Sequence, residues 1–180
     1  ALYNKLGYVT QKAVLFSGTV EDNVFFGQSA AEKTDASLQA ALSLSQAAEF
    51  VDKYPEKAAH PIAQLGRNVS GGQKQRLSIA RALARTPEIL IFDDSFSALD
   101  YKTDATLREG LAKELPGTTK IIVAQRISTI RNADQILVLD RGEIAGLGTH
   151  DALMASCTVY REIAMSQLSE EELKKGGASK

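Results

Sequence analysis

The sequence contains little cysteine, no marked excess of charge and no long apolar run. A single cysteine, Cys157, excludes an internal disulfide and fits a reducing compartment, so we expect a structural or incidental thiol. The 21 basic and 22 acidic side chains give a net charge of −1, so nothing indicates a nucleic-acid backbone or an anionic membrane as a direct partner. No apolar stretch approaches the length of a membrane span, and we expect no signal peptide at the first residues.

Residues 68–76 are the most informative stretch, because a small polar residue and two glycines lead directly into a helical pattern. Apolar residues then recur at three- and four-residue spacing, which predicts a helix that leaves Lys74, Arg76 and Arg81 solvated. Ser70 is a suitable N-cap residue. The first turn of the helix has unpaired backbone N–H groups that can bind a phosphate, and the two glycines let it approach the backbone closely. An ordinary capped helix after a glycine turn is the alternative. The inward positions are Leu77, Ala80, Leu83 and Ala84.

Residues 88–94 form a short apolar run that ends in two acids, Asp93 and Asp94. This pattern is typical of a buried parallel strand that carries carboxylates at its C-terminal end. Ligands bind at that edge in open α/β sheets, and a hard cation that bridges phosphates needs a carboxylate.

Weaker signals place the remaining elements. Thr19 can cap a helix, with Asp22 three residues on, and the leucines up to Leu115 predict an amphipathic helix after Asp100. Both histidines, His60 and His150, are expected on the surface. The other expected elements are strands at 5–10, 119–124 (buried), 135–139 and 143–147, two helices within 31–53 broken near Ser45, and a loop at 55–68.

The order of these motifs resembles the nucleotide-binding domain of ABC proteins. The Ser-Gly-Gly-Gln stretch matches the family's signature, with Val69 where Leu is usual, and the strand ending at Asp93 matches Walker B. The segment from Ser97 to Asp100 matches the D-loop, and Gln11 matches the Q-loop glutamine. The Leu-Phe-Ser-Gly-Thr sequence at 15–19 is similar to that in the ATPase domains of membrane exporters.

The resemblance implies an α/β fold: part of a P-loop NTPase (RecA-like) parallel sheet with an inserted α-helical subdomain. It implies a P-loop strand between the strands at 119–124 and 135–139, and without that strand the apolar side chains of both would face water. The implied regions are 1–18 (Q-loop strand and loop), 19–86 (helical subdomain with the signature), 87–167 (C-terminal part of the RecA-like core) and 168–180 (disordered tail).

The resemblance also implies ATP and Mg²⁺ as cofactors and a set of site residues. The catalytic residues would be Asp94, Gln125 and Gln11; the nucleotide contacts Ser70, Gly71, Gly72, Gln73 and Asp100; and the metal contacts Asp93 and Gln11.

Three departures from the family pattern stand out. The chain contains no Gly-x-x-x-x-Gly-Lys-Ser/Thr loop, so we expect a partial domain that is inactive alone. Asp94 stands where hydrolytic members carry Glu, and Gln125 stands where the switch His is usual. Asp has a shorter reach, and Gln cannot become cationic, so both changes weaken hydrolysis.

These departures favour the degenerate half of a heterodimeric exporter, on the cytoplasmic face of the plasma membrane. Its partners would be a second, non-identical ATPase domain and transmembrane domains, with no nucleic acid, and the isolated fragment would self-associate. The alternatives are drift within an active homodimer, a soluble ABC-type ATPase, and a non-enzymatic interaction fragment. The transported substrate cannot be identified from these residues.

Overall fold

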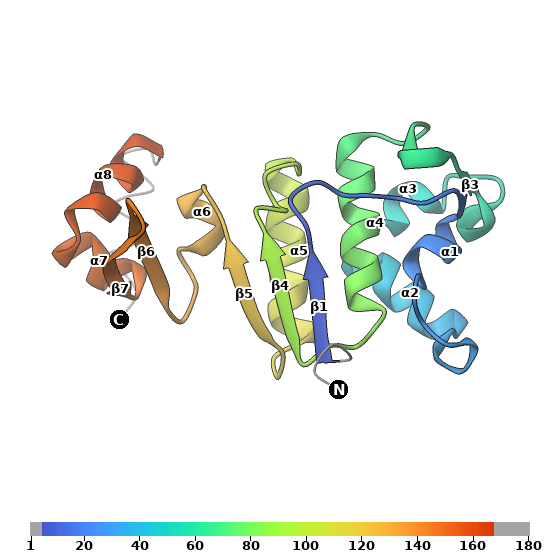
Figure 1. Ribbon diagram of the computed structural model, residues 1–180, viewed down its shortest axis with the longest axis horizontal. Helices are drawn as coiled ribbons and strands as arrows, with labels where there is room; N and C mark the ends of the chain where they lie inside the picture. The colour runs from blue at the N-terminus through green and yellow to red at the C-terminus, as the bar shows by residue number, and fades with distance from the viewer. Residues whose placement is uncertain (1–4, 168–180) are drawn as a thin grey trace. The chain divides into compact units, whose positions relative to one another are not determined.

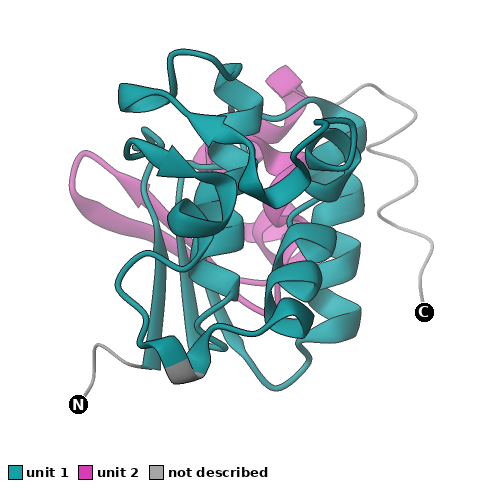
Figure 2. Cartoon of the chain, turned by 90° about the vertical axis from the view of Figure 1, so that its right-hand side faces the viewer, with its two compact units in different colours: residues 1–123 teal, residues 124–180 magenta. Residues whose placement is uncertain are grey.

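The computed structural model describes residues 5–167, which form two compact units, residues up to Val123 and residues from Ala124 on (Figure 2). The tail expected to be disordered, 168–180, lies outside the described residues. In the first unit the strands are β1 (Leu6–Val9), β2 (Gly18–Thr19), β3 (Pro61–Ile62), β4 (Ile89–Asp93) and β5 (Thr119–Val123). Its helices are α1 (Val20–Val24), α2 (Asp35–Leu44), α3 (Ala48–Val51), α4 (Gly71–Leu83) and α5 (Tyr101–Glu114), with 3-10 turns at Ala30–Glu32, Lys57–Ala59 and Gln64–Gly66.

The main sheet of the first unit is parallel, in the order β1-β4-β5, which confirms the predicted parallel α/β fold (Figure 1). Tyr8 lies opposite Ile91 in the register, and Asp93 lies opposite Val123. The C-terminal ends of these strands therefore meet at one edge, and both acids of the Asp93-Asp94 pair come to that edge.

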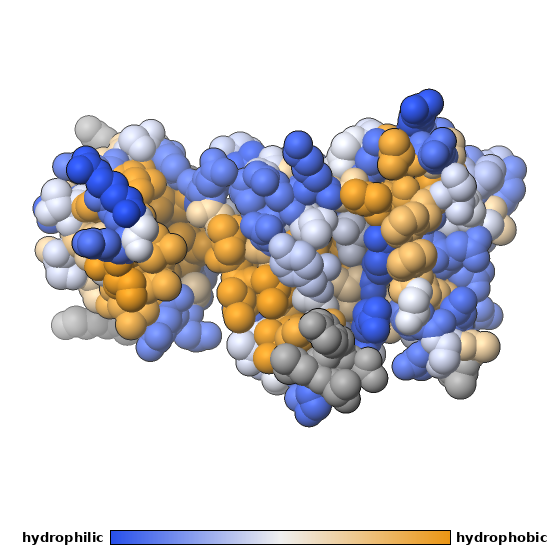
Figure 3. Space-filling view, in the orientation of Figure 1, coloured by the Kyte–Doolittle hydropathy of each residue, from blue (hydrophilic) through white to orange (hydrophobic). Residues whose placement is uncertain are grey.

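The two faces of this sheet differ in burial. Val9, Leu90 and Phe92 are fully buried and join one core cluster with residues of α4 and α5. Because successive strand residues face opposite sides, Tyr8, Ile121 and Val123 lie on the other face, where they are 55%, 49% and 53% exposed. In Figure 3 the hydrophobic colour gathers over β4 and β5. The apolar run at 119–124 alone predicts burial, but among the described residues the sheet ends at β5, which is an exposed edge strand. This exposure is what the resemblance implies for a chain without the P-loop strand.

The helical part of the first unit follows its predicted start and stop signals. Thr19 caps α1 in a capping box with Asp22, Thr34 caps α2 in the same way with Ser37, and the chain breaks at Ser45 between α2 and α3. Both α1 and α2 pack on α4. The segment expected to be a loop also contains β3, because its backbone pairs with β2 at the entrance to α1.

The second unit contains α6 (Ile127–Ile130), an antiparallel hairpin of β6 (Ile136–Asp140) and β7 (Glu143–Gly148), α7 (His150–Ser156) and α8 (Thr158–Gln167). Its core includes Cys157, whose burial fits a structural thiol. The prediction of a surface His150 is wrong. Its ring is buried with Tyr160, 2.9 Å from the phenol oxygen, and burial together with the charge of Arg131 lowers the pKa of His150.

The open apolar faces predict that the isolated 180-residue chain self-associates, because exposed strands and apolar side chains favour pairing with another chain. Ile121 and Val123 are exposed in the first unit, as are Leu137 and Leu139 in the second. Light scattering coupled to size exclusion over a dilution series should show dimers or larger species. Lysine at an edge strand opposes pairing, so Ile121→Lys should shift the distribution toward monomer. A monodisperse wild-type monomer with cooperative unfolding would contradict this expectation.

Candidate functional site

The site begins at the N-terminus of α4, where the structure confirms Ser70 as the N-cap. The Ser70 Oγ accepts from the Gln73 N–H at 3.3 Å, and the Gln73 Oε1 accepts from the Ser70 N–H at 2.8 Å. This reciprocal capping box fixes the entry of the chain into the helix. It also shows that the Gln73 side chain is engaged with its own helix start.

The two glycines of the first turn have different surroundings. A Cβ atom added at Gly71 would meet nothing within 4 Å, whereas one added at Gly72 would lie 3.4 Å from the backbone oxygen of Ala98. The start of α4 therefore adjoins the segment from Ser97 to Asp100 through Gly72. On the side of Gly71 it is open, which leaves room for an anion to reach the helix N-terminus.

Asp100 has a structural role at the start of α5. Its Oδ1 accepts from the Thr103 N–H at 3.0 Å, and its Oδ2 accepts from the Thr103 hydroxyl at 2.7 Å. The backbone bond from Thr103, followed by the hydroxyl bond, lowers the pKa of Asp100. The carboxylate thus stays ionised as the N-cap of α5, and its contact with a nucleotide stays a prediction.

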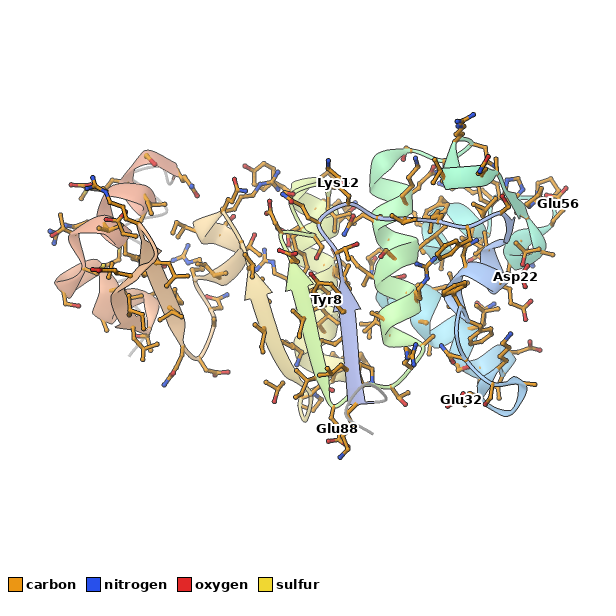
Figure 4. All side chains as sticks on the ribbon, viewed as in Figure 1. Tyr8, Lys12, Asp22, Glu32, Glu56 and Glu88 are labelled. Carbon is orange, nitrogen blue, oxygen red and sulfur yellow. The ribbon has the colours of Figure 1, made fainter. Side chains whose placement is uncertain are left out.

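The two acids at the end of β4 are each hydrogen-bonded by a residue of the first strand region. The Tyr8 hydroxyl donates to Asp93 Oδ2 at 2.9 Å, and the Gln11 amide donates to Asp94 Oδ2 at 3.1 Å. The bond to Asp93, then desolvation and the charge of that carboxylate, raise the pKa of Tyr8 above its ordinary value. The phenol therefore stays protonated at neutral pH and remains a hydrogen-bond donor to Asp93. Figure 4 labels Tyr8 on β1, beside β4.

Asp94 is 8% exposed and has an unusual backbone. Its φ is 45°, in the left-handed region, and its N–H donates to the carbonyl of Val123 at 2.9 Å. Asp enters this region more readily than most residues with a side chain. No local pattern predicts this conformation, and the hydrogen-bond partner of the Asp94 N–H lies 29 residues further along the chain.

Gln75 connects α4 to the Q-loop segment, a role that was not predicted. Its side chain is 2% exposed, and its amide donates to the carbonyl of Thr10 at 3.1 Å, next to Gln11. The helical spacing did not indicate this role, because Gln75 lies two residues before the first of the predicted inward-facing positions. All of those positions, Leu77, Ala80, Leu83 and Ala84, are buried as predicted.

Arg81 is not solvated as predicted, because it packs against the segment after Gln11. Its guanidinium donates to the carbonyls of Val14 and Asn23 at 3.0 and 2.7 Å, and to Asn23 Oδ1 at 3.0 Å. It also lies 5.4 and 5.5 Å from the ring centroids of Phe16 and Phe26, which stack on each other at 4.3 Å. Burial lowers the pKa of Arg81. The two rings are 43% and 49% exposed and form an aromatic patch.

Arg76 is also more enclosed than predicted. It pairs with Glu49 at 2.8 Å and lies 4.8 Å from the ring centroid of Phe50.

Gln125, the last of the predicted site residues, belongs to the second unit, where its backbone carbonyl accepts from the Gln167 amide at 2.8 Å.

The donor set at the end of β4 suits a hard divalent cation. Asp93 and Asp94 supply carboxylate oxygens, and Gln11 keeps its amide oxygen as an acceptor when its nitrogen donates to Asp94. Mg²⁺ is typically bound by one or two carboxylates together with phosphate oxygens. The residues present therefore fit a hard divalent cation such as Mg²⁺.

Among residues 5–167, no helix is both long enough and apolar enough to cross a membrane.

Residues 1–97, just over half of the chain, match the family model described as ABC transporter. A putative ABC transporter ATP-binding protein of Mycoplasma pneumoniae is 42% identical over 174 residues, covering 92% of this chain and 28% of that protein. ATP-binding cassette sub-family B member 5 of Homo sapiens is 41% identical over 162 residues, covering 90% of this chain and 13% of that protein.

The fold matches a solved structure, a bacterial Atm1-family ABC exporter with ATP bound. The TM-score is 0.87 at 36% identity, over 93% of this chain and 29% of that one. The chain thus spans just over a quarter of the length of the first bacterial relatives that it matches. From the matched family model, the motifs and the fold, the chain belongs to the ABC transporter family and corresponds to part of an exporter-type nucleotide-binding domain.

Proposed function

We propose that this chain is the C-terminal part of the ATP-binding domain of an ABC exporter, which couples Mg-ATP binding and hydrolysis to transmembrane transport. The observation that carries the proposal is the contact between Gln11 and Asp94 at the C-terminal end of β4. It joins the segment that leads toward the aromatic patch with the acid that follows Walker B. Such a contact would let a change at Asp94 act on the segment that follows Gln11.

In the proposed mechanism Asp93 and Gln11 would hold Mg²⁺, which would neutralise charge on the phosphates. Asp94 orients the attacking water as a base, and Gln125 contacts the γ-phosphate as a hydrogen-bond donor. The N-terminus of α4, with Ser70 and Gly71, binds the nucleotide held by a second ATPase domain. Closure of the two domains then precedes hydrolysis.

The proposed parent is a heterodimer with one impaired and one competent site. Asp94 and Gln125 both replace the usual residues and would serve this subunit's own site, whereas the capped helix start at Ser70 is intact and would serve the partner's site. An active homodimer that has drifted at both positions is the second candidate.

The partner surface toward the transmembrane domains is proposed at the aromatic patch of Phe16 and Phe26. These rings are exposed, and Arg81 binds their segment to α4. Transmembrane domains would place the chain on the cytoplasmic face of the plasma membrane. The exporter-like sequence at 15–19 favours this function over a soluble ABC-type ATPase. The net charge of −1 also favours it, because a soluble ATPase that works on nucleic acid would be expected to carry basic patches.

The proposal is tested on the complete transporter in lipid vesicles, by measuring ATP hydrolysis and ATP-driven transport together. Asp93→Asn should remove cation-dependent nucleotide binding at one of the two sites. Gln11→Ala should reduce transport per ATP hydrolysed. Hydrolysis unaffected by Asp93→Asn at either site, or transport unaffected by Gln11→Ala, would contradict the proposed roles.

The 180-residue chain alone should neither bind ATP tightly nor hydrolyse it. It contains no Gly-x-x-x-x-Gly-Lys-Ser/Thr loop, whose backbone amides and Lys hold the phosphates in P-loop NTPases. A calorimetric titration with Mg-ATP should show no saturable heat at micromolar concentrations. Micromolar affinity, or turnover that follows the protein through purification, would contradict this prediction.

A further inference from the structure

Tyr8 and Asp93 come from neighbouring strands, and the register brings them to one face of the sheet. Tyr8 lies opposite Ile91, and Asp93 lies two residues further along β4, so Ile91 and Asp93 face the same side as Tyr8. The tyrosine side chain extends toward the C-terminal end of the strands, where its hydroxyl reaches Asp93 Oδ2 at 2.9 Å.

This bond restricts the orientation of the carboxylate. The ionised Asp93 group accepts hydrogen bonds but donates none, and the phenol occupies one acceptor position on Oδ2. While this bond is made, the remaining lone pairs of the Asp93 carboxylate keep one orientation relative to β4. Carboxylates that bind metal ions are commonly oriented by such hydrogen bonds, and loss of the bond typically lowers metal affinity 10- to 100-fold.

Packing within the part of the chain that the structure describes does not account for this tyrosine. Its side chain is 55% exposed, and it belongs to neither buried core cluster of the described residues. A hydrogen bond between exposed groups contributes little to stability, because water competes for both partners. Gln11, three residues on, makes the parallel contact with Asp94, so the β1 region supplies one donor to each acid.

We propose that Tyr8 is a positioning residue that orients Asp93 for the divalent cation bound with the nucleotide. This rests on the proposed function, because it assumes that Asp93 contacts the cation. It adds a specific role for the phenol hydroxyl, which acts through Asp93 and does not touch the substrate.

The test is a titration of the complete transporter with Mn²⁺ in the presence of ATP, with bound cation counted by electron paramagnetic resonance. Tyr8→Phe keeps the ring and removes only the hydroxyl. It should raise the half-saturating Mn²⁺ concentration of one class of site about 10-fold. ATP affinity measured with a chelator, without cation, should not change.

Two variants make the result decisive. Asp93→Asn should remove the same class of Mn²⁺ site, and Tyr54→Phe removes a hydroxyl from a ring that stacks on His60 in the helical region and should leave the titration unchanged. A Tyr8→Phe titration equal to wild type, beside a clear effect of Asp93→Asn, would overturn the role of Tyr8 alone. No effect of Asp93→Asn would overturn the proposed function and this inference together.

Discussion

Ser70→Arg in the complete transporter is expected to abolish ATP turnover at the partner's site and to leave this subunit's own site able to bind nucleotide. The substitution removes the side-chain acceptor that caps α4 and places a cation at the positive end of the helix dipole. The long side chain would also fill the open space beside Gly71, where no atom lies within 4 Å of an added Cβ. Loss of a single preorganised donor costs roughly 10²–10³ in kcat, so we expect at least this reduction.

The measurement is nucleotide trapping resolved by site in the full dimer. Thr34→Arg is the matched control, because Thr34 caps α2 in the same way, with its hydroxyl accepting from Ser37, but lies in the helical arm. Each variant should lose about 0.5–2 kcal/mol of stability from the cap, and only Ser70→Arg should lose trapping. Loss confined to this subunit's own site would contradict the assignment.

Asp94→Glu combined with Gln125→His should raise hydrolysis at this subunit's own site, by as much as about a hundredfold. A displacement of about 1 Å at a reacting group can cost this factor, and the added methylene of Glu restores the reach. The imidazole restores a group that can become cationic. The gain should appear although Glu enters the left-handed backbone at residue 94, where φ is 45°, less readily than Asp.

Single-site trapping would again report which site responds. Each single variant should give a smaller gain than the pair, and Asp52→Glu, the same change at the exposed end of α3, should give none. If the double variant left hydrolysis at this site unchanged while the partner's site stayed active, the impairment would lie elsewhere. The heterodimer proposal would then lose its main support.

The sequence was sufficient wherever a structure depends on near neighbours. The N-caps at Thr19 and Ser70 form with residues three positions on, so a local pattern identified both helix starts. The apolar run ending at Asp93 was also enough to predict β4 and the edge that carries the acids.

The errors concern features set by residues far apart in the chain. Arg81 contacts rings more than fifty positions earlier, so its spacing within the helix could not show that it is enclosed. The apolar sequence of β5 alone predicted burial, and only the resemblance, which places a P-loop strand beside it, indicated that β5 would be exposed in a chain without that strand. Tyr8 and Asp93 are 85 positions apart, and no local pattern relates them.

Gly71 has a consequence for protein engineering. Replacing glycine by alanine where the backbone conformation allows it is a common way to stabilise a domain, and can gain up to about 1 kcal/mol per site. Judged by free space alone, Gly71 and Gly117 are equally suitable, because neither has an atom within 4 Å of an added Cβ. A stability screen would therefore accept both substitutions. An added methyl group at residue 117 would cover only a turn, whereas at residue 71 it would cover the opening of α4, so a thermostabilised variant chosen by this rule could fold better and transport less.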